Sequence, residues 1–248
     1  MRPHLLLLSA VLALSILSTP ALAEDEVDPG KALLKQLMTL RKAEDADGLA
    51  KAAATVPEIY KASADKSLRG KLLGELGKVV KDDDLGVARL AAVEAIVALE
   101  DPKAAWKALA KNLPGHKVEE ASEVDLAVVR AAGTLAQSRA VKPLLELAAK
   151  AKQAEVAAAA AKALGGYNAD KRGRVKLLEE LISIGKRTRP GRSTEKAVSE
   201  ESQKRWETVR PSLVAGLNKL TGRDESSFED WEALWDDYKK RPKELFVD

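Results

Sequence analysis

Cysteine is absent from the 248-residue chain, which excludes disulfide bonds, thiolate catalysis and cysteine-ligated zinc. Histidine occurs only twice, and aromatic residues make up 4% of the sequence. No stretch beyond the first 23 residues is apolar enough for a membrane-spanning helix, which needs roughly 20 apolar residues. A strong charge of one sign is also missing, because the formal net charge is only +3. That balance argues against a general polyanion-binding protein.

The apolar residues that are present are chiefly alanine, leucine and valine, a set that favours closely packed helices over sheets. Their spacing is helical, with Leu33, Leu37 and Leu40 on one face of their segment. Turns rich in Gly, Pro and Asp divide residues 29 to 221, and one such helix stop is expected at Pro57. No segment alternates as a strand does. These patterns predict an all-α fold.

The first 23 residues have the three parts of a secretory signal peptide. A basic start at Arg2 precedes an apolar run over residues 5–17, and Ala21-Leu22-Ala23 is a small-x-small cleavage sequence. An uncleaved anchor or a buried N-terminal helix is the alternative interpretation. Cleavage after Ala23 would place the mature protein in the periplasm or outside the cell, without a membrane span.

An internal repeat lies in the middle of the chain. Residues 84–91 (DLGVARLA) align with residues 125–132 (DLAVVRAA), 41 positions later, and each copy is followed by a second helical segment. A degenerate third copy without the arginine runs from Val156 to Gly165. A single helix pair of this kind leaves its apolar face exposed, so neighbouring pairs are expected to stack.

An Asp followed by Val, Arg and small residues resembles the first helix of a HEAT repeat, and the resemblance covers roughly residues 82–166. It implies a right-handed α-solenoid of about five or six helix pairs over residues 24–222. A non-repeating helical bundle is the alternative. In the family, the Asp and the Arg commonly link neighbouring repeats, which implies structural roles for Asp84, Arg89, Asp125 and Arg130. We expect the two arginines to bond to these aspartates or to carbonyls of adjacent repeats.

The last 26 residues, 223–248, differ from the repeats. After a helix stop at Gly222, Ser226-Ser227-Phe228-Glu229 suggests a capping box that begins a new helix. Four aromatic residues then share one face of that helix: Phe228, Trp231, Trp235 and Tyr238. This ending resembles the terminal segment of many exported HEAT-type proteins of environmental bacteria. We expect it to cover the open end of the last repeat; an aromatic helix that docks a partner is the alternative.

Basic residues cluster around Pro190-Gly191, and no aromatic residue interleaves with them, which argues against nucleic acid. The cluster comprises Lys186, Arg187, Arg189, Arg192 and Lys196. Three interpretations remain open: a loop that binds an acidic partner, a solvated loop, and a loop that pairs with the acidic segment 224–237 of the same chain.

The sequence contains no recognisable catalytic, metal-binding or cofactor-binding motif. His116, the one histidine of the mature chain, lies in a Pro-Gly turn, and Asp45-Ala46-Asp47-Gly48 is an incomplete calcium loop. We therefore predict a non-catalytic protein-binding or scaffold module of the bacterial cell envelope, with no cofactor. The alternatives are a binder of an anionic surface polymer and an enzyme or accessory resembling the HEAT-like lyases.

Overall fold

The computed structural model describes residues 28–167, 170–191 and 199–246, so the predicted signal peptide lies outside it. This part of the chain forms helices and contains no strand, in agreement with the predicted all-α class. The α-helices are α1 (Pro29–Lys42), α2 (Ala46–Ala62), α3 (Lys66–Lys81), α4 (Val87–Val97), α5 (Pro102–Leu109), α6 (Glu123–Leu135), α7 (Ser138–Lys150), α8 (Ala154–Leu164), α9 (Lys171–Thr188), α10 (Glu200–Thr221) and α11 (Phe228–Tyr238). Three 3-10 helices are η1 (Asp83–Leu85), η2 (Ala110–Asn112) and η3 (Pro242–Leu245). Among these residues no helix combines the length and apolarity needed to cross a bilayer.

Side-chain caps set most of the helix starts. A carboxylate or hydroxyl just before the helix accepts hydrogen bonds from amide groups of the first turn, which would otherwise have no partner. The capping residues are Asp28, Asp45, Asp65, Asp101, Ser122, Asp170, Ser199 and Ser227. The calcium-like sequence at Asp45 is therefore a helix start, with the carboxylate bound to the Gly48 amide at 2.9 Å.

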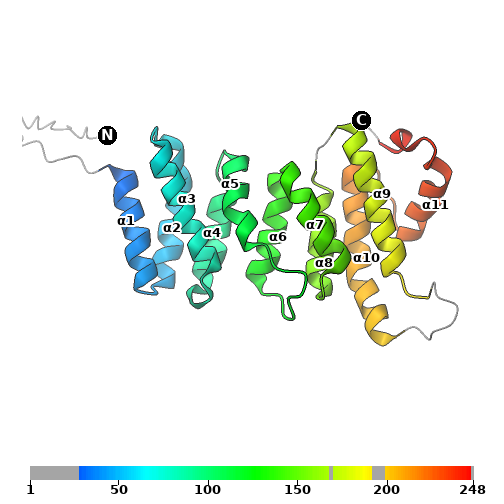
Figure 1. Cartoon of the computed structure of the whole chain (residues 1–248), viewed down its shortest axis with the longest axis horizontal. Coiled ribbons are helices and arrows are strands. Elements are labelled where there is room, and N and C mark those ends of the chain that lie inside the picture. The colour runs from blue at the N-terminus through cyan, green and yellow to red at the C-terminus, as the bar shows by residue number, and fades with distance from the viewer. Residues whose placement is uncertain (1–27, 168–169, 192–198, 247–248) are drawn as a thin grey trace, which may run out of the picture.

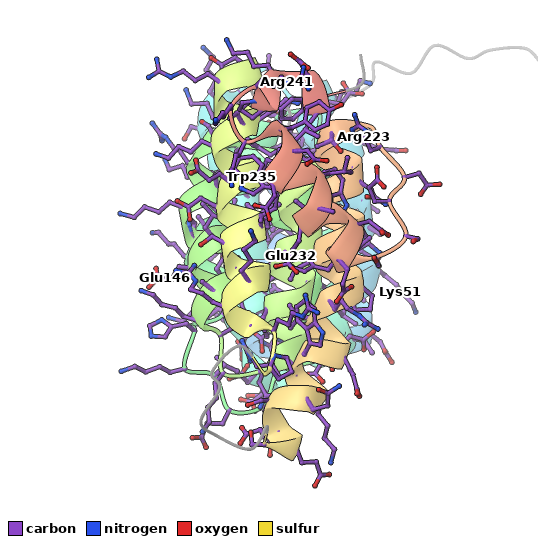
Figure 2. The ribbon with its side chains drawn as sticks, turned by 90° about the vertical axis from the view of Figure 1, so that its right-hand side faces the viewer. Lys51, Glu146, Arg223, Glu232, Trp235 and Arg241 are labelled. Atoms are coloured by element: carbon purple, nitrogen blue, oxygen red, sulfur yellow. The ribbon has the colours of Figure 1, made fainter. Side chains whose placement is uncertain are left out.

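The helices form a row two layers deep (Figure 1). The even-numbered helices from α2 to α10 pack side by side in one layer; α1, α3 and α5 pack in turn in the other, as do α7 and α9. Figure 2 looks along the row from its C-terminal end. In this view Lys51 of α2 and Glu146 of α7 point to opposite sides of the row. Leucine, valine and alanine side chains from both layers form one continuous core.

The three sequence copies occupy equivalent places in one layer, because α4, α6 and α8 are consecutive neighbours there. We expected each copy to begin a helix pair. The contacts between layers instead make each copy the second helix of its pair. The first copy, α4, packs more extensively on the preceding α3 than on the following α5, and the third copy, α8, packs on the preceding α7. The described part of the chain thus has five stacked pairs, α1/α2 to α9/α10, followed by α11.

The helix stop expected at Pro57 is wrong, because Pro57 lies inside α2. Proline removes one backbone hydrogen bond and disfavours a helix interior. Here the residues on both sides of it, Val56 and Tyr60, are buried in the core and hold the helix across the proline. Tertiary packing therefore overrides the local preference.

Candidate functional site

The floor of a groove is formed by α8, in which seven of the 11 residues are alanine. Its neighbours approach closely: a Cβ atom added to Gly133 of α6 would lie 2.6 Å from the Cβ of Ala163. On the other side, a Cβ added to Gly216 of α10 would lie 2.5 Å from the carbonyl oxygen of Ala161. Small residues at these contacts let the three backbones meet, and they leave a shallow channel over α8 between the longer side chains of α6 and α10.

The groove has a volume of about 500 Å³ and carries one cation from each of its three helices. These are Arg130 on α6, Lys162 on α8 and Lys219 on α10, all exposed. None of these three side chains has a hydrogen bond or ion pair with any other residue in the described ranges. Glu155 is the one carboxylate in the lining, so the groove has a local excess of positive charge.

The remaining groove residues are small or carry hydroxyl groups. Thr134, Thr208 and Ser212 place hydroxyls beside an alanine floor. The Thr134 hydroxyl donates to the carbonyl of Arg130 at 3.3 Å, and that of Thr208 donates to Lys204 at 3.1 Å, so both oxygens remain able to accept. A segment with acidic and short apolar side chains would therefore find complementary groups along this channel.

Reactive groups do not come together in the part of the chain that is described. His116 is 40% exposed, and its Nδ1 lies 3.8 Å from a Glu146 carboxylate oxygen, beyond hydrogen-bond distance. No group of three or more metal-ligating side chains occurs in these ranges. The arrangement around the groove can bind a molecule, and it offers no nucleophile with an adjacent base.

The first predicted repeat link is present through a backbone carbonyl, and not through Asp84. Arg89 is 16% exposed, donates through Nε to the Val80 carbonyl of α3 at 2.9 Å and lies 2.8 Å from a carboxylate oxygen of Asp83. The partner expected at Asp84 is wrong, because that side chain is exposed on the 3-10 turn before α4. Arg89 therefore fastens the start of α4 to the end of α3.

The second predicted link is wrong. Asp125 is the third residue of α6, and its carboxylate accepts from the amide and hydroxyl of Ser122 at 2.9 and 2.8 Å. It closes a capping box within its own helix and has no bond to Arg130. Arg130 instead projects from the exposed face of α6 into the groove.

Part of the basic cluster pairs with the C-terminal helix. Arg189 lies 2.5 Å from an oxygen of Glu232 and 3.4 Å from one of Glu229, and Lys186 lies 3.7 Å from Asp236. Figure 2 shows Glu232 on α11, in front of α9. Of the three interpretations, internal pairing therefore holds at these two cations. Arg189 is therefore not free in solvent.

The other members of the basic cluster are placed differently. Arg187 is exposed and lines a second cleft, beside α7 and α10. Arg192 and Lys196 lie outside the described residues. The described members of the cluster therefore face two different surroundings, α11 and the second cleft.

Two of the four tail aromatics are fully buried. Phe228 and Trp231 are 0% exposed, whereas Trp235 and Tyr238 are half-buried. The Phe228 ring meets Trp206 edge-to-face with centroids 5.4 Å apart, and the Trp231 indole donates to Asn218 at 2.8 Å.

The capping box of the tail lies one residue later than expected, between Ser227 and Asp230. Its serine hydroxyls hold the pKa of the Asp230 carboxyl below the ordinary value. The helix it starts, α11, lies against α9 and α10 at the C-terminal end of the row (Figure 1), so the first half of α11 packs as a cap would.

A buried ion pair that the sequence patterns do not reveal joins α1 to α3. Glu75 is 3% exposed, and its carboxylate lies 2.6 Å from Nε of Arg41 and 2.9 Å from Nζ of Lys78. Burial raises the pKa of this carboxyl, but the hydrogen bonds from the two cations outweigh burial and bring the pKa below its ordinary value. A single glutamate on an apolar helix face was the only sequence signal for it.

Comparison with known proteins does not identify a family for this chain. No protein-family model, curated protein or solved structure matches this chain. The described part of the chain is thus all-helical, with two stacked layers and a positively charged groove over α8. Any finer assignment depends on the residues described above.

Proposed function

We propose that this chain is a non-catalytic protein-binding or scaffold module of the bacterial cell envelope, built as a right-handed α-solenoid of HEAT-type helix pairs. The two-layered row and the equivalent places of α4, α6 and α8 support the repeat architecture. The location in the cell envelope is proposed from residues 1–23 alone, because they match a signal peptide.

The observation that carries the binding role is the groove over α8. Three cations from three successive helices of one layer face it without partners in the described part of the chain, and its floor is made of alanine. Exposed cations without partners bring their full charge to an incoming anion, and they chiefly raise association rates. The occupant we propose is an acidic segment of a partner protein, with short apolar side chains against the floor.

Charge reversal tests this assignment. The variant Arg130→Glu, Lys162→Glu, Lys219→Glu should fold as the wild type does, because all three side chains are exposed and unpaired. A control variant, Lys51→Glu, Lys103→Glu, Lys142→Glu, changes the net charge equally at exposed positions outside the groove. Immobilised mature protein of each kind is exposed to an envelope extract, and the retained proteins are quantified at low and moderate salt.

The expected result is a set of acidic proteins retained by the wild type and the control, released by salt, and lost from the groove variant. Equal retention by wild type and groove variant would exclude the groove as the binding surface. Retention of nothing by the wild type above an uncoated matrix would count against the binding role itself.

A further inference from the structure

A second cleft lies where the C-terminal ends of α7 and α9 meet the beginning of α10, at the lower edge of the row in Figure 1. It has a volume of about 490 Å³, and six residues line it. They are Ala149, Lys150, Arg187, Thr188, Ser202 and Arg205. The cleft shares α10 with the groove over α8 but has no residue in common with it.

The lining contains three cations and no carboxylate. Arg187 has no hydrogen bond or ion pair with any residue in the described ranges. Lys150 has one loose partner, a Glu146 oxygen 3.8 Å away at the surface, and such pairs contribute little. Arg205 uses one NH1 group on the Lys152 carbonyl at 3.1 Å, which leaves the rest of its guanidinium for a ligand.

Helix-end electrostatics explains only part of this cluster. Lys150 and Arg187 lie in the last turns of α7 and α9, where cations favour the helix dipole. Arg205 lies in the second turn of α10, near the positive end of that helix, where the dipole does not favour a cation. The bond to Lys152 nevertheless holds its guanidinium at the cleft beside the other two cations. Helix stability therefore does not account for the three charges together.

We propose that this cleft binds an oxyanion of the phosphate type, held between the Arg187 and Arg205 guanidinium groups with Lys150 as a third positive charge. Guanidinium forks match two oxygens of a phosphate group, and three cations favour a doubly charged anion over a carboxylate. The Ser202 hydroxyl, 2.7 Å from that of Ser199, adds a polar group at the same wall. A free phosphate and a phosphorylated polymer share this chemistry, and the experiment separates them.

Titration calorimetry of the mature protein provides the test, with inorganic pyrophosphate and inorganic polyphosphate as separate probes at low salt. Arg187→Ala is the decisive variant, because its side chain is exposed and has no hydrogen bond or ion pair in the described fold that the mutation would break. Arg139→Ala, an exposed arginine at the opposite end of α7, is the matched control. Arg187→Ala should weaken binding at least tenfold, and the control should bind as the wild type does.

The two probes identify the source of the anion. Saturable pyrophosphate binding that is lost in Arg187→Ala supports the site with a free oxyanion as ligand. Binding of polyphosphate alone, weakened in the same variant, supports the site with a polymer as ligand. No binding of either probe by the wild type, or equal binding by Arg187→Ala, overturns the proposal. None of these outcomes bears on the groove over α8, whose cations stay unchanged in every variant.

Discussion

Truncating the Phe228 side chain to alanine should loosen α11 from the end of the row. The ring is 0% exposed, meets Trp206 edge-to-face, and fills the space beside Gly185, where a side chain would overlap it. Replacing a buried phenylalanine by alanine costs about 3–5 kcal/mol, in which an aromatic pair counts for about 0.5–1.5 kcal/mol. Since the aromatic pair is lost with the ring, we expect the free energy of unfolding to fall by about 4 kcal/mol.

Urea unfolding followed by circular dichroism and by tryptophan fluorescence measures this change, since Trp206 and Trp231 are both buried near the mutated site. Trp235→Ala serves as the comparison and should cost less, because that ring is only half-buried. A loss below about 1 kcal/mol for Phe228→Ala, within the range of ordinary substitutions, would refute the capping role. The tail would then be better explained as a docking helix.

Three further variants test contacts elsewhere. Arg89→Ala should cost about 1–3 kcal/mol, because the side chain loses its charged hydrogen bond to Val80, whereas Arg130→Ala should stay within about 0.5 kcal/mol. Thermal unfolding of the two variants compares them, and equal melting temperatures would contradict their assignment. Glu75→Gln should lose about 2 kcal/mol at neutral pH by weakening the bond to Arg41. Because the pKa of Glu75 is lower in the folded than in the unfolded state, its ionised carboxylate stabilises the fold at pH values above the unfolded-state pKa of about 4.5. The difference in unfolding free energy between wild type and Glu75→Gln should therefore shrink as the pH falls below about 4.5. A difference that does not change with pH would rule out the ion pair as its cause.

Local signals in the sequence predicted the helix boundaries well, because capping groups and glycine act within one turn. The first helix begins at Pro29 and α10 ends at Thr221, just before Gly222, whose φ of 77° lies in the left-handed region that favours glycine. The one stop that failed, Pro57, lies where long-range packing decides the backbone. Local chemistry thus fixes where a helix ends unless the core holds it together.

The role of Arg130 was missed because the two repeat copies match in amino-acid sequence, whereas their helices turn different faces towards the core. Val87 is 57% exposed, whereas its aligned partner Val128 is fully buried. The buried positions instead repeat with an offset of 36, which pairs Ala88 with Val124 and Ala92 with Val128. The five residues between the two offsets turn a helix face by about 140°, enough to move an arginine from a helix contact to solvent.

The physical cause of this difference lies before α4. Gly86, with φ of 41°, and the 3-10 turn that precedes it delay the start of α4 until Val87. In the second copy, the helix starts two residues before Asp125. An alignment of amino-acid identities does not detect a change in backbone conformation between two copies, so it could not show which arginine packs against a neighbouring helix.

Net charge was a poor guide to binding because pairing inside the fold redistributes it. The chain totals only +3, which argued against a general polyanion-binding protein. The carboxylates of α11, however, neutralise Lys186 and Arg189, the cations that stood out in the sequence. The unpaired cations lie on surfaces that several helices build together, over α8 and at the end of α9. Over about 8–10 Å of screening length, a bound anion responds to those local charges far more than to the total, so a nearly neutral protein can still present two positively charged sites.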